Sequence, residues 1–377
     1  MREIYLDNSA TTKVSDSAAA KAVGMMKECY GNPSSLHTLG ILAEREVGAA
    51  RAAVAGAISA SSEEIIFTSG GTEANNLALF GSAEARRRRG SRIVTSAIEH
   101  SSVLESAKQL ENSGFEVVFL QPDRNGNIAE EQIAAAVDER TVLVSLMLVN
   151  NEVGSVLPLS AARAAIKRSN APALLHCDAV QAFGKMPVSV KSIGCDLLTV
   201  TGHKVHAPKG VGALFVKKGV RILPRQFGGE QEKRIRPGTE STPLIAAFGQ
   251  AVADFPDLDA SLDNARKLWQ YAKERLLTID KLTINSPDDA LPYILNFSTN
   301  SLRSEIMLHH LAAMGIYCSS GSACAKGEPS HVLKAMKLSR TAADTAIRVS
   351  FDYATTFEDI DLLVEAVKDG IAKRGKY

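Results

Sequence analysis

Polar residues that could do chemistry follow several short apolar runs of this chain. Lys204 ends the segment TVTGHK, and Asp178 ends the segment LLHCD. A lysine amine can form a Schiff base with an aldehyde, and pyridoxal phosphate is a cofactor that is held by this bond. An aspartate can pair with the ring nitrogen of that cofactor and keep the ring an electron sink. Lys204 alone is typical of a loop lysine, whereas Lys204 together with Asp178 predicts a pyridoxal-phosphate site.

Three more apolar runs end in residues that could complete such a site. Gly70-Gly71-Thr72-Glu73 follows IIFTS and precedes a predicted helix, so close backbone approach and free N–H groups could bind a phosphate. Glu99-His100 follows RIVTSAI, and the imidazole ring could stack on a cofactor. Asn150-Asn151-Glu152 follows TVLVSLMLV, and Gln181 comes soon after Asp178. Ligands of open α/β sheets bind beyond the carboxyl ends of the strands. Polar residues at the ends of several predicted strands therefore favour one shared binding site over unrelated polar residues in loops.

Cys324 lies in the small, polar segment CSSGSACAKGEPSH (318–331). A thiol there could be exposed and reach a ligand, although reactivity also requires a route to the thiolate. An incidental cysteine in a mobile loop is the alternative. Cys318 adjoins the apolar run LAAMGIY, and we interpret it and Cys177 as structural. The 5 cysteines are widely spaced and none form a C-x-x-C pair, so we predict neither a disulfide framework nor a metal site.

Arg348 lies within the strand-like run AIRVSF, where an arginine needs an anionic partner. A substrate carboxylate would match the two-pronged guanidinium group. A structural ion pair is the alternative, and the sequence leaves both open.

The elements that must position these residues alternate between short β-branched runs and longer alanine-rich stretches. This alternation predicts an α/β fold with a mainly parallel sheet covered by helices. An amphipathic helix at 256–277 is predicted to connect to a second domain that contains ILNFS, the segment around Cys324, AIRVSF and a final helix. In the first part, strands are predicted at 63–69, 92–98, 115–121, 141–149, 173–180, 195–201 and 212–218, and helices at 75–89 and 101–114.

Length and composition restrict the class of protein. The 377 residues are 45% hydrophobic and 23% charged, which is typical of a soluble globular protein with more than one domain-sized unit. The net charge of +1 argues against a nucleic-acid or membrane-surface protein. The start MREIYLDNSATT is no signal peptide, and no window approaches the about 18 apolar residues of a membrane span. We therefore expect a cytoplasmic protein that binds neither nucleic acid nor membrane.

Motifs along nearly the whole chain resemble, in order and spacing, those of the cysteine desulfurase family, which includes the nitrogen-fixation and iron–sulfur-cluster types. The resemblance implies a pyridoxal-phosphate-dependent transferase of fold type I that works as a homodimer. It implies a large domain at 15–258 with a mainly parallel seven-stranded sheet, and a smaller α+β domain at 1–14 and 259–377 that carries the Cys324 loop. The motifs are LDNSATT, GNPSSLH, FTSGGTEANNLA, EHSSVL, VNNEVG, HCDAVQAFGK, TGHKVHAPKGVGAL, RPGTE and SSGSAC.

The resemblance also implies a reaction and a set of site residues. The family converts L-cysteine to L-alanine and leaves the sulfur as an enzyme persulfide, which passes to a protein acceptor for iron–sulfur cluster assembly or for thiolation of tRNA or cofactors. Lys204 would form the Schiff base, His100 would stack on the ring and transfer protons, and Cys324 would accept the sulfur. The other implied contacts are Asp178 at the pyridine nitrogen, Asn151 and Gln181 at the ring and its 3-oxygen, Gly71, Thr72, Thr201 and His203 at the phosphate, Thr239 at the phosphate of the other subunit, and Asn32 and Arg348 at the substrate carboxylate.

Three alternatives share this fold. Another class-V aminotransferase-fold enzyme would not need Cys324, and a selenocysteine lyase would prefer the selenium substrate strongly. An inactive relative that acts as a sulfur-relay partner would tolerate loss of the cofactor residues, yet Lys204, Asp178 and His100 are all present.

Overall fold

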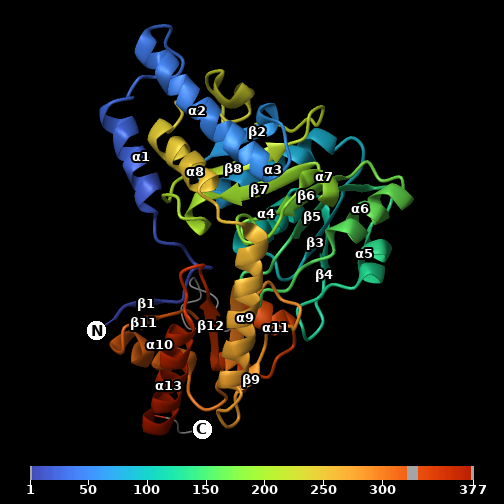
Figure 1. Cartoon of the computed structure of the whole chain (residues 1–377). Coiled ribbons are helices and arrows are strands. Elements are labelled where there is room, and N and C mark those ends of the chain that lie inside the picture. Colours follow the sequence, from blue (N-terminus) through green and yellow to red (C-terminus); the bar gives the residue numbers. More distant parts are fainter. Residues whose placement is uncertain (1, 321–329, 375–377) are drawn as a thin grey trace.

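The computed structural model describes residues 2–320 and 330–374. In Figure 1 the upper part holds a large sheet wrapped by helices, and the lower part holds two small sheets, the N-terminus and the C-terminus. Cys324 lies outside the described residues. Among those residues no helix is both long and apolar enough to cross a membrane.

A seven-stranded sheet forms the core of the upper part, in the order β2-β8-β7-β6-β5-β3-β4. The five strands from β7 to β4 are parallel, whereas β8 runs antiparallel to both of its neighbours. The predicted mainly parallel sheet is therefore confirmed. The strands are β2 (Ile65–Thr68), β3 (Arg92–Ser96), β4 (Glu116–Leu120), β5 (Thr141–Met147), β6 (Leu174–Asp178), β7 (Leu197–Thr201) and β8 (Gly212–Val216).

Helices cover both faces of this sheet, which explains why β5, β6 and β7 are buried throughout. Successive strand residues face opposite sides, so that Leu197 packs in one apolar cluster and Leu198 in the other. The helices of this part are α1 (Asp16–Lys27), α2 (Thr38–Ala57), α3 (Gly71–Arg86), α4 (Ser101–Asn112), α5 (Glu130–Ala136), α6 (Leu159–Arg168), α7 (Val190–Ile193) and α8 (Thr242–Ala253), with the 3₁₀ turns η1 (Ser62–Glu64), η2 (Gly202–Lys204) and η3 (Gln231–Arg234).

Helix α9 (Leu258–Leu276) runs from the large sheet into the lower part of the molecule (Figure 1). There a three-stranded antiparallel sheet has the order β12-β10-β9, and the N-terminal β1 pairs in parallel with β11. The elements are β1 (Ile4–Tyr5), β9 (Thr283–Ile284), β10 (Ile294–Ser298), β11 (Ile316–Tyr317), β12 (Ala346–Ser350), α10 (Ser304–Ala313), α11 (His331–Ala335), α12 (Arg340–Asp344) and α13 (Phe357–Arg374).

The helix predicted at 75–89 begins earlier, at Gly71, and ends at Arg86. Gly70 has a φ of 155°, a conformation that side chains disfavour, and its carbonyl accepts the first bond of the helix from the Ala74 amide. The turn after β2 is therefore tight, and it brings the start of α3 directly to the sheet edge. The signal for this start was the glycine pair itself.

Helices α2 and α8 pack so closely that Gly249 has no room for a side chain. A Cβ atom on Gly249 would lie 2.4 Å from Ala50 Cα and 2.5 Å from Ala50 Cβ. We expect Gly249→Ala to push the two helices apart and to lower the free energy of unfolding by about 1–3 kcal/mol. Denaturant unfolding measures this. The control is Gly48→Ala on α2, where nothing lies within 4 Å and the change should stabilise slightly. Equal effects at both positions would contradict the packing account.

Candidate active site

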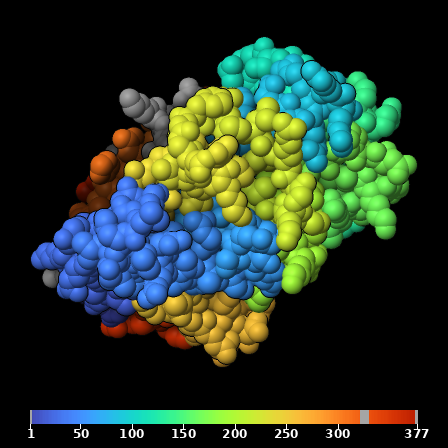
Figure 2. Space-filling view, turned by 90° about the horizontal axis from the view of Figure 1, so that it is seen from above, coloured from blue at the N-terminus to red at the C-terminus, as the bar shows by residue number. Residues whose placement is uncertain are grey.

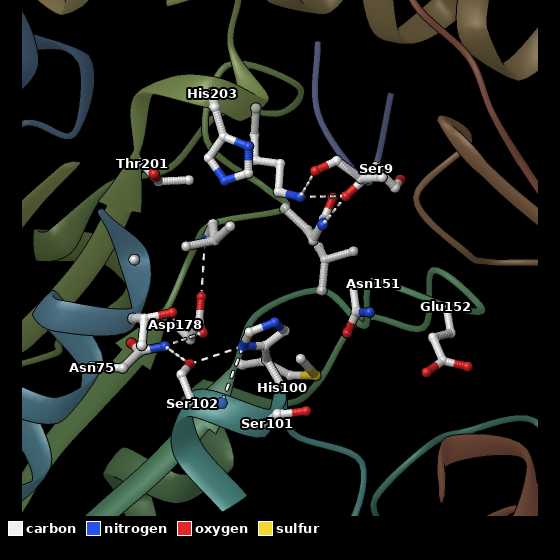
Figure 3. Close-up of a pocket in the computed structure, with 18 of the residues that line it drawn as sticks. Ser9, Asn75, His100, Ser101, Ser102, Asn151, Glu152, Asp178, Thr201 and His203 are labelled. Atoms are coloured by element: carbon white, nitrogen blue, oxygen red, sulfur yellow. Dashed lines mark hydrogen bonds between the residues drawn. The ribbon is translucent and has the colours of Figure 1, made fainter. Parts of the chain in front are cut away.

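A cavity of about 540 Å³ lies beyond the carboxyl ends of β5, β6 and β7. Ser9 and Ala10 of the N-terminal segment also line the cavity, as does Arg348 of β12. Figure 3 shows labelled side chains from several elements pointing into this space. The cavity is lined by ten of the residues named from the sequence: Gly71, Thr72, His100, Asn151, Asp178, Gln181, Thr201, His203, Lys204 and Arg348.

Lys204 enters the cavity from η2, immediately after the end of β7. Its Nζ donates hydrogen bonds to the carbonyl oxygens of Ser9 and Ala10, each at 2.5 Å. Burial lowers the pKa of Lys204 to about 7, with smaller lowering contributions from Lys185 and Arg348 and opposing ones from Asp7 and Asp178. A substantial fraction of this amine is therefore uncharged at neutral pH, which is the form that attacks an aldehyde.

Asp178 stands at the end of β6 and is only 4% exposed. Its Oδ2 accepts a hydrogen bond from Asn75 Nδ2 at 2.7 Å, and its Oδ1 accepts one from the Val180 amide at 3.0 Å. Asn75 also donates to Ser102 Oγ at 2.8 Å, and these contacts are visible in Figure 3. The carboxylate is thus held rigidly while it faces the cavity. Sequence reasoning missed Asn75 as a site residue, although it lies in the helix after the glycine pair.

His100 is the N-cap of α4, so the start of the helix fixes its ring. Its Nδ1 accepts a hydrogen bond from the Ser102 amide at 3.2 Å and also contacts Ser102 Oγ at 2.8 Å. Burial lowers the pKa of His100, and the charge of Lys204 lowers it further, whereas Asp178 raises it. The neutral ring therefore carries its proton on Nε2, the nitrogen that is not used by the helix cap.

The start of α3 provides a place for an anion. A Cβ atom on Gly71 would lie 3.1 Å from Val180 Cγ2, so glycine keeps this corner of the cavity open. Thr72, Thr201 and His203 line the same cavity, and burial lowers the pKa of His203 to about 4. Backbone N–H groups of a helix start and neutral hydroxyl and imidazole donors suit a phosphate.

Taken together, the donor set fits pyridoxal phosphate. An amine with a lowered pKa, a buried carboxylate, a neutral imidazole and an anion-binding helix start share one cavity. Across the part of the chain that the structure describes, no group of histidine, cysteine or acidic side chains could hold a metal ion. These residues are therefore suited to a covalently held, phosphorylated aldehyde.

Gln181 and Arg348 complete the wall next to the N-terminal segment. Gln181 Nε2 donates to the Ser9 carbonyl at 3.0 Å. Arg348 Nη2 lies 2.8 Å from Asp7 Oδ1, and its Nη1 donates to the Asn151 carbonyl at 2.8 Å. The ion pair that the sequence left open is thus present, and the same arginine also lines the cavity.

Two predicted residues do not reach this cavity. Asn32 and Thr239 are exposed and do not line it. Thr239 was expected to contact the phosphate of the other subunit, and that expectation stays a prediction. Asn32 does not line the cavity that Arg348 lines, and its contact with the substrate carboxylate also stays a prediction.

Sequence reasoning also missed cavity residues that come from distant segments. Ser9 lies in LDNSATT, and His331 is the last residue of the segment 318–331 that carries Cys324. His331 Nε2 donates to the Glu99 carbonyl at 3.0 Å, and Ser330 Oγ donates to Glu152 Oε2 at 2.5 Å. No local pattern marks them, because their role depends on how the lower part folds against the sheet.

Three of the described cysteines, none of which lines the cavity, are held as thiols. Burial raises the pKa of Cys318 and of Cys195 to about 12 each, and it raises that of Cys177 as well. A protonated thiol is a poor nucleophile, so these three suit the structural role that the sequence predicted for Cys318 and Cys177.

Glu99 makes the stability of this region depend on pH. The residue is 0% exposed, its Oε1 accepts from Ser96 Oγ and the Met147 amide, and burial raises its pKa from 4.5 to about 8. Between these values the unfolded chain loses the proton and the folded chain keeps it. The protein therefore loses stability as pH rises from about 4.5 to about 8.

We expect Glu99→Gln to remove this loss, since the amide oxygen can accept the same two hydrogen bonds without ionising. The variant should be as stable as the parent at pH 5 and more stable by roughly 2–4 kcal/mol at pH 8. Urea unfolding at both values measures the difference. Glu105→Gln, at an exposed position on α4, is the control. If the difference in the free energy of unfolding between Glu99→Gln and the parent were the same at both pH values, Glu99 would be ionised in the folded protein.

Comparison with known proteins agrees with this site. The family model for class-V aminotransferases matches residues 4–363. The chain is 38% identical to a protein named cysteine desulfurase IscS from Methanosarcina thermophila, over 99% of this chain and 93% of the relative. A solved NifS-like protein has a TM-score of 0.93 at 35% identity, with coverage of 99% of this chain and 100% of that one. A structure titled SspA in complex with cysteine has a TM-score of 0.83 at 32% identity, with coverage of 94% and 100%. The chain therefore belongs to the class-V aminotransferase family, and within it to the cysteine desulfurases.

Proposed function

We propose that this chain is a pyridoxal-phosphate-dependent cysteine desulfurase that converts L-cysteine to L-alanine and retains the sulfur on Cys324. The observation that carries the proposal is the meeting of Lys204, Asp178 and the glycine-rich start of α3 around one cavity. When bound, pyridoxal phosphate supplies an electron sink that stabilises negative charge on the substrate α-carbon. The protein supplies the groups that hold the cofactor and move protons.

The proposed cofactor contacts are assigned to residues that line the cavity. Lys204 would hold the aldehyde carbon through Nζ, and Asp178, fixed by Asn75, would pair with the ring nitrogen. His100 would stack on the ring. Asn151 and Gln181 would contact the ring and its 3-oxygen, and the phosphate would be bound by Gly71, Thr72, Thr201 and His203.

Substrate binding would use Arg348. Its guanidinium reaches the cavity from β12, and its contacts with Asp7 and the Asn151 carbonyl keep it oriented. A substrate carboxylate is an anion that this fork can bind. The SspA structure that resembles this chain holds cysteine, which supports the choice of substrate. Asn32 would join Arg348 only through movement of its segment or through another subunit.

Lys204 and His100 would move the protons. With the substrate bound in its place on the cofactor, the Lys204 amine would be able to remove the α-proton, because its pKa of about 7 leaves much of it uncharged at neutral pH. His100 presents its Nε2 proton and can donate to the substrate. Both groups line the same cavity, so neither transfer requires a long path.

The sulfur step would belong to Cys324. Its thiolate would attack the substrate sulfur, and the new S–S bond would form as the bond between that sulfur and the β-carbon breaks. The electron pair of the broken bond would stay with the β-carbon, which would take up a proton. The α-carbon would regain the proton held by Lys204 before alanine leaves. The described residues on both sides of its segment are fixed beside the cavity, since Ser319 bonds to the Arg348 backbone and Ser330 to Glu152.

We propose that the enzyme is a homodimer. Leu36 is 96% exposed and Phe227 is 87% exposed, and Tyr30, Ile41 and Leu42 are further exposed apolar residues. Figure 2 shows the segment 221–241, in yellow, beside the blue N-terminal helices on one face. An apolar surface of this kind favours association. A partner on this face would place Thr239, which is exposed in the single chain, near the phosphate of the other subunit.

We further propose a cytoplasmic enzyme that passes its persulfide sulfur to a protein acceptor, for iron–sulfur cluster assembly or thiolation. Relatives that carry the name IscS support the link to cluster assembly. We also propose the division into a large domain at 15–258 and a small domain at 1–14 and 259–377. The parallel pairing of β1 with β11, far apart in the sequence, supports the assignment of the N-terminal residues to the small domain.

The test compares two cysteine variants. Cys324→Ala should retain bound cofactor and lose formation of alanine and sulfide from L-cysteine, because the acceptor of the sulfur is gone. Cys318→Ala is the matched control and should keep the activity, since its thiol is held protonated. Alanine is quantified by chromatography, with selenocysteine as a parallel substrate. Full activity of Cys324→Ala with L-cysteine would exclude the persulfide mechanism.

A further inference from the structure

A second lysine, Lys185, is buried behind the active-site wall. It follows the turn after β6 and is 6% exposed. It does not line the main cavity, but it lines a cavity of about 30 Å³ together with Lys204 and Asp352. That volume can hold about one water molecule, so the two lysines face a small shared space. Burial of an ammonium group costs free energy unless its charge and its N–H groups are compensated. We therefore asked which groups Lys185 interacts with.

Hydrogen bonds connect Lys185 to Lys204 through two intermediate groups. Lys185 Nζ donates to Gln181 Oε1 at 3.3 Å, and Gln181 Nε2 donates to the Ser9 carbonyl at 3.0 Å. The same Ser9 carbonyl accepts from Lys204 Nζ at 2.5 Å. Since an ammonium group can only donate, Lys185 forces the amide oxygen of Gln181 toward itself and the amide nitrogen toward the cavity side.

We propose that Lys185 is a positioning residue: its ammonium group fixes the orientation of the Gln181 amide, and its positive charge favours the uncharged amine of Lys204. This inference rests on the proposed function, because it concerns the groups that would receive the cofactor. Lys185 touches neither cofactor nor substrate in this scheme. It acts through Gln181 and through the electric field across the small cavity.

The charges around Lys204 decide the strength of this effect. Asp178 on β6 and Asp7 on the N-terminal segment favour its charged form, whereas Lys185 and Arg348 on β12 disfavour it. His203 on η2 and His100 at the start of α4 also face it, and burial keeps both neutral. Arg348 pairs with Asp7, and Lys185 is the larger of the two cationic contributions that lower the pKa of Lys204.

Lys185 keeps its own charge in the useful pH range. Burial lowers its pKa to about 8, while Asp352 raises it and Arg348 lowers it. At pH 7 most of the Lys185 side chains are therefore charged. The effect on Lys204 is strongest below about pH 8 and fades above it.

The test follows cofactor binding by the apoprotein rather than turnover. The rate at which pyridoxal phosphate binds, measured by visible absorbance from pH 6 to 10, reports the fraction of uncharged Lys204. The parent protein should show a midpoint near pH 7. Lys185→Met should move that midpoint upward by roughly 0.5–1 pH unit and change the spectrum of the bound cofactor, because Gln181 is released.

Two further variants separate charge from hydrogen bonding and guard against misfolding. Lys185→Gln can still donate to Gln181 but has no charge, so it should raise the midpoint while the spectrum stays close to that of the parent. Lys185→Arg keeps both properties and should resemble the parent. Lys191→Met, at an exposed lysine after the same turn, is the control.

The outcomes distinguish this inference from the function on which it rests. An apoprotein of the parent sequence that binds no pyridoxal phosphate would overturn the proposed function. Normal binding with the same midpoint in the parent, Lys185→Met and Lys185→Gln would overturn the role of Lys185 alone. If Lys185→Met does not fold, Lys185→Gln decides the charge effect.

Discussion

The contact between Lys204 and the carbonyls of Ser9 and Ala10 is the interaction on which the rest of the site depends. Lys204 follows β7 of the large sheet, whereas Ser9 and Ala10 belong to a segment whose strand β1 pairs in the lower part of the molecule. The bond joins these two parts at the edge of the cavity. It also keeps water from much of the amine, and the resulting burial lowers the pKa of Lys204.

Charged side chains of opposite sign surround this contact and compensate one another. Asp178 and Asp7 are opposed by Arg348 and Lys185, and burial keeps His100 and His203 neutral. Such a balance allows an uncharged lysine and a charged aspartate to exist close together at the same pH. The proposed chemistry would need both, because the amine would attack and accept protons while the carboxylate would keep the cofactor ring an electron sink.

The sequence, with the family resemblance, was sufficient for the mainly parallel sheet and for about half of the residues that line the cavity. Lys204, Asp178 and His100 follow strands, and the carboxyl ends of parallel strands meet at one edge, so strand order was not needed to group them. The sequence did not identify Asn75, Ser9 and Lys185 as site residues, because their roles arise from contacts between distant segments. The start of α3 was predicted too late, because the conformation of Gly70 determines where this helix begins. Asn32 does not line the cavity of the single chain, and its role at the substrate carboxylate stays a prediction.

The central claim is that Lys204 carries pyridoxal phosphate in this cavity. Borohydride reduction of the purified protein, followed by digestion and mass spectrometry, fixes the cofactor permanently to the lysine that holds it. The account predicts a pyridoxyl group on the peptide that contains Lys204 and an unmodified peptide at Lys185, the other buried lysine near the site. A modification on Lys185, or none on any lysine of a protein supplied with the cofactor, would contradict it.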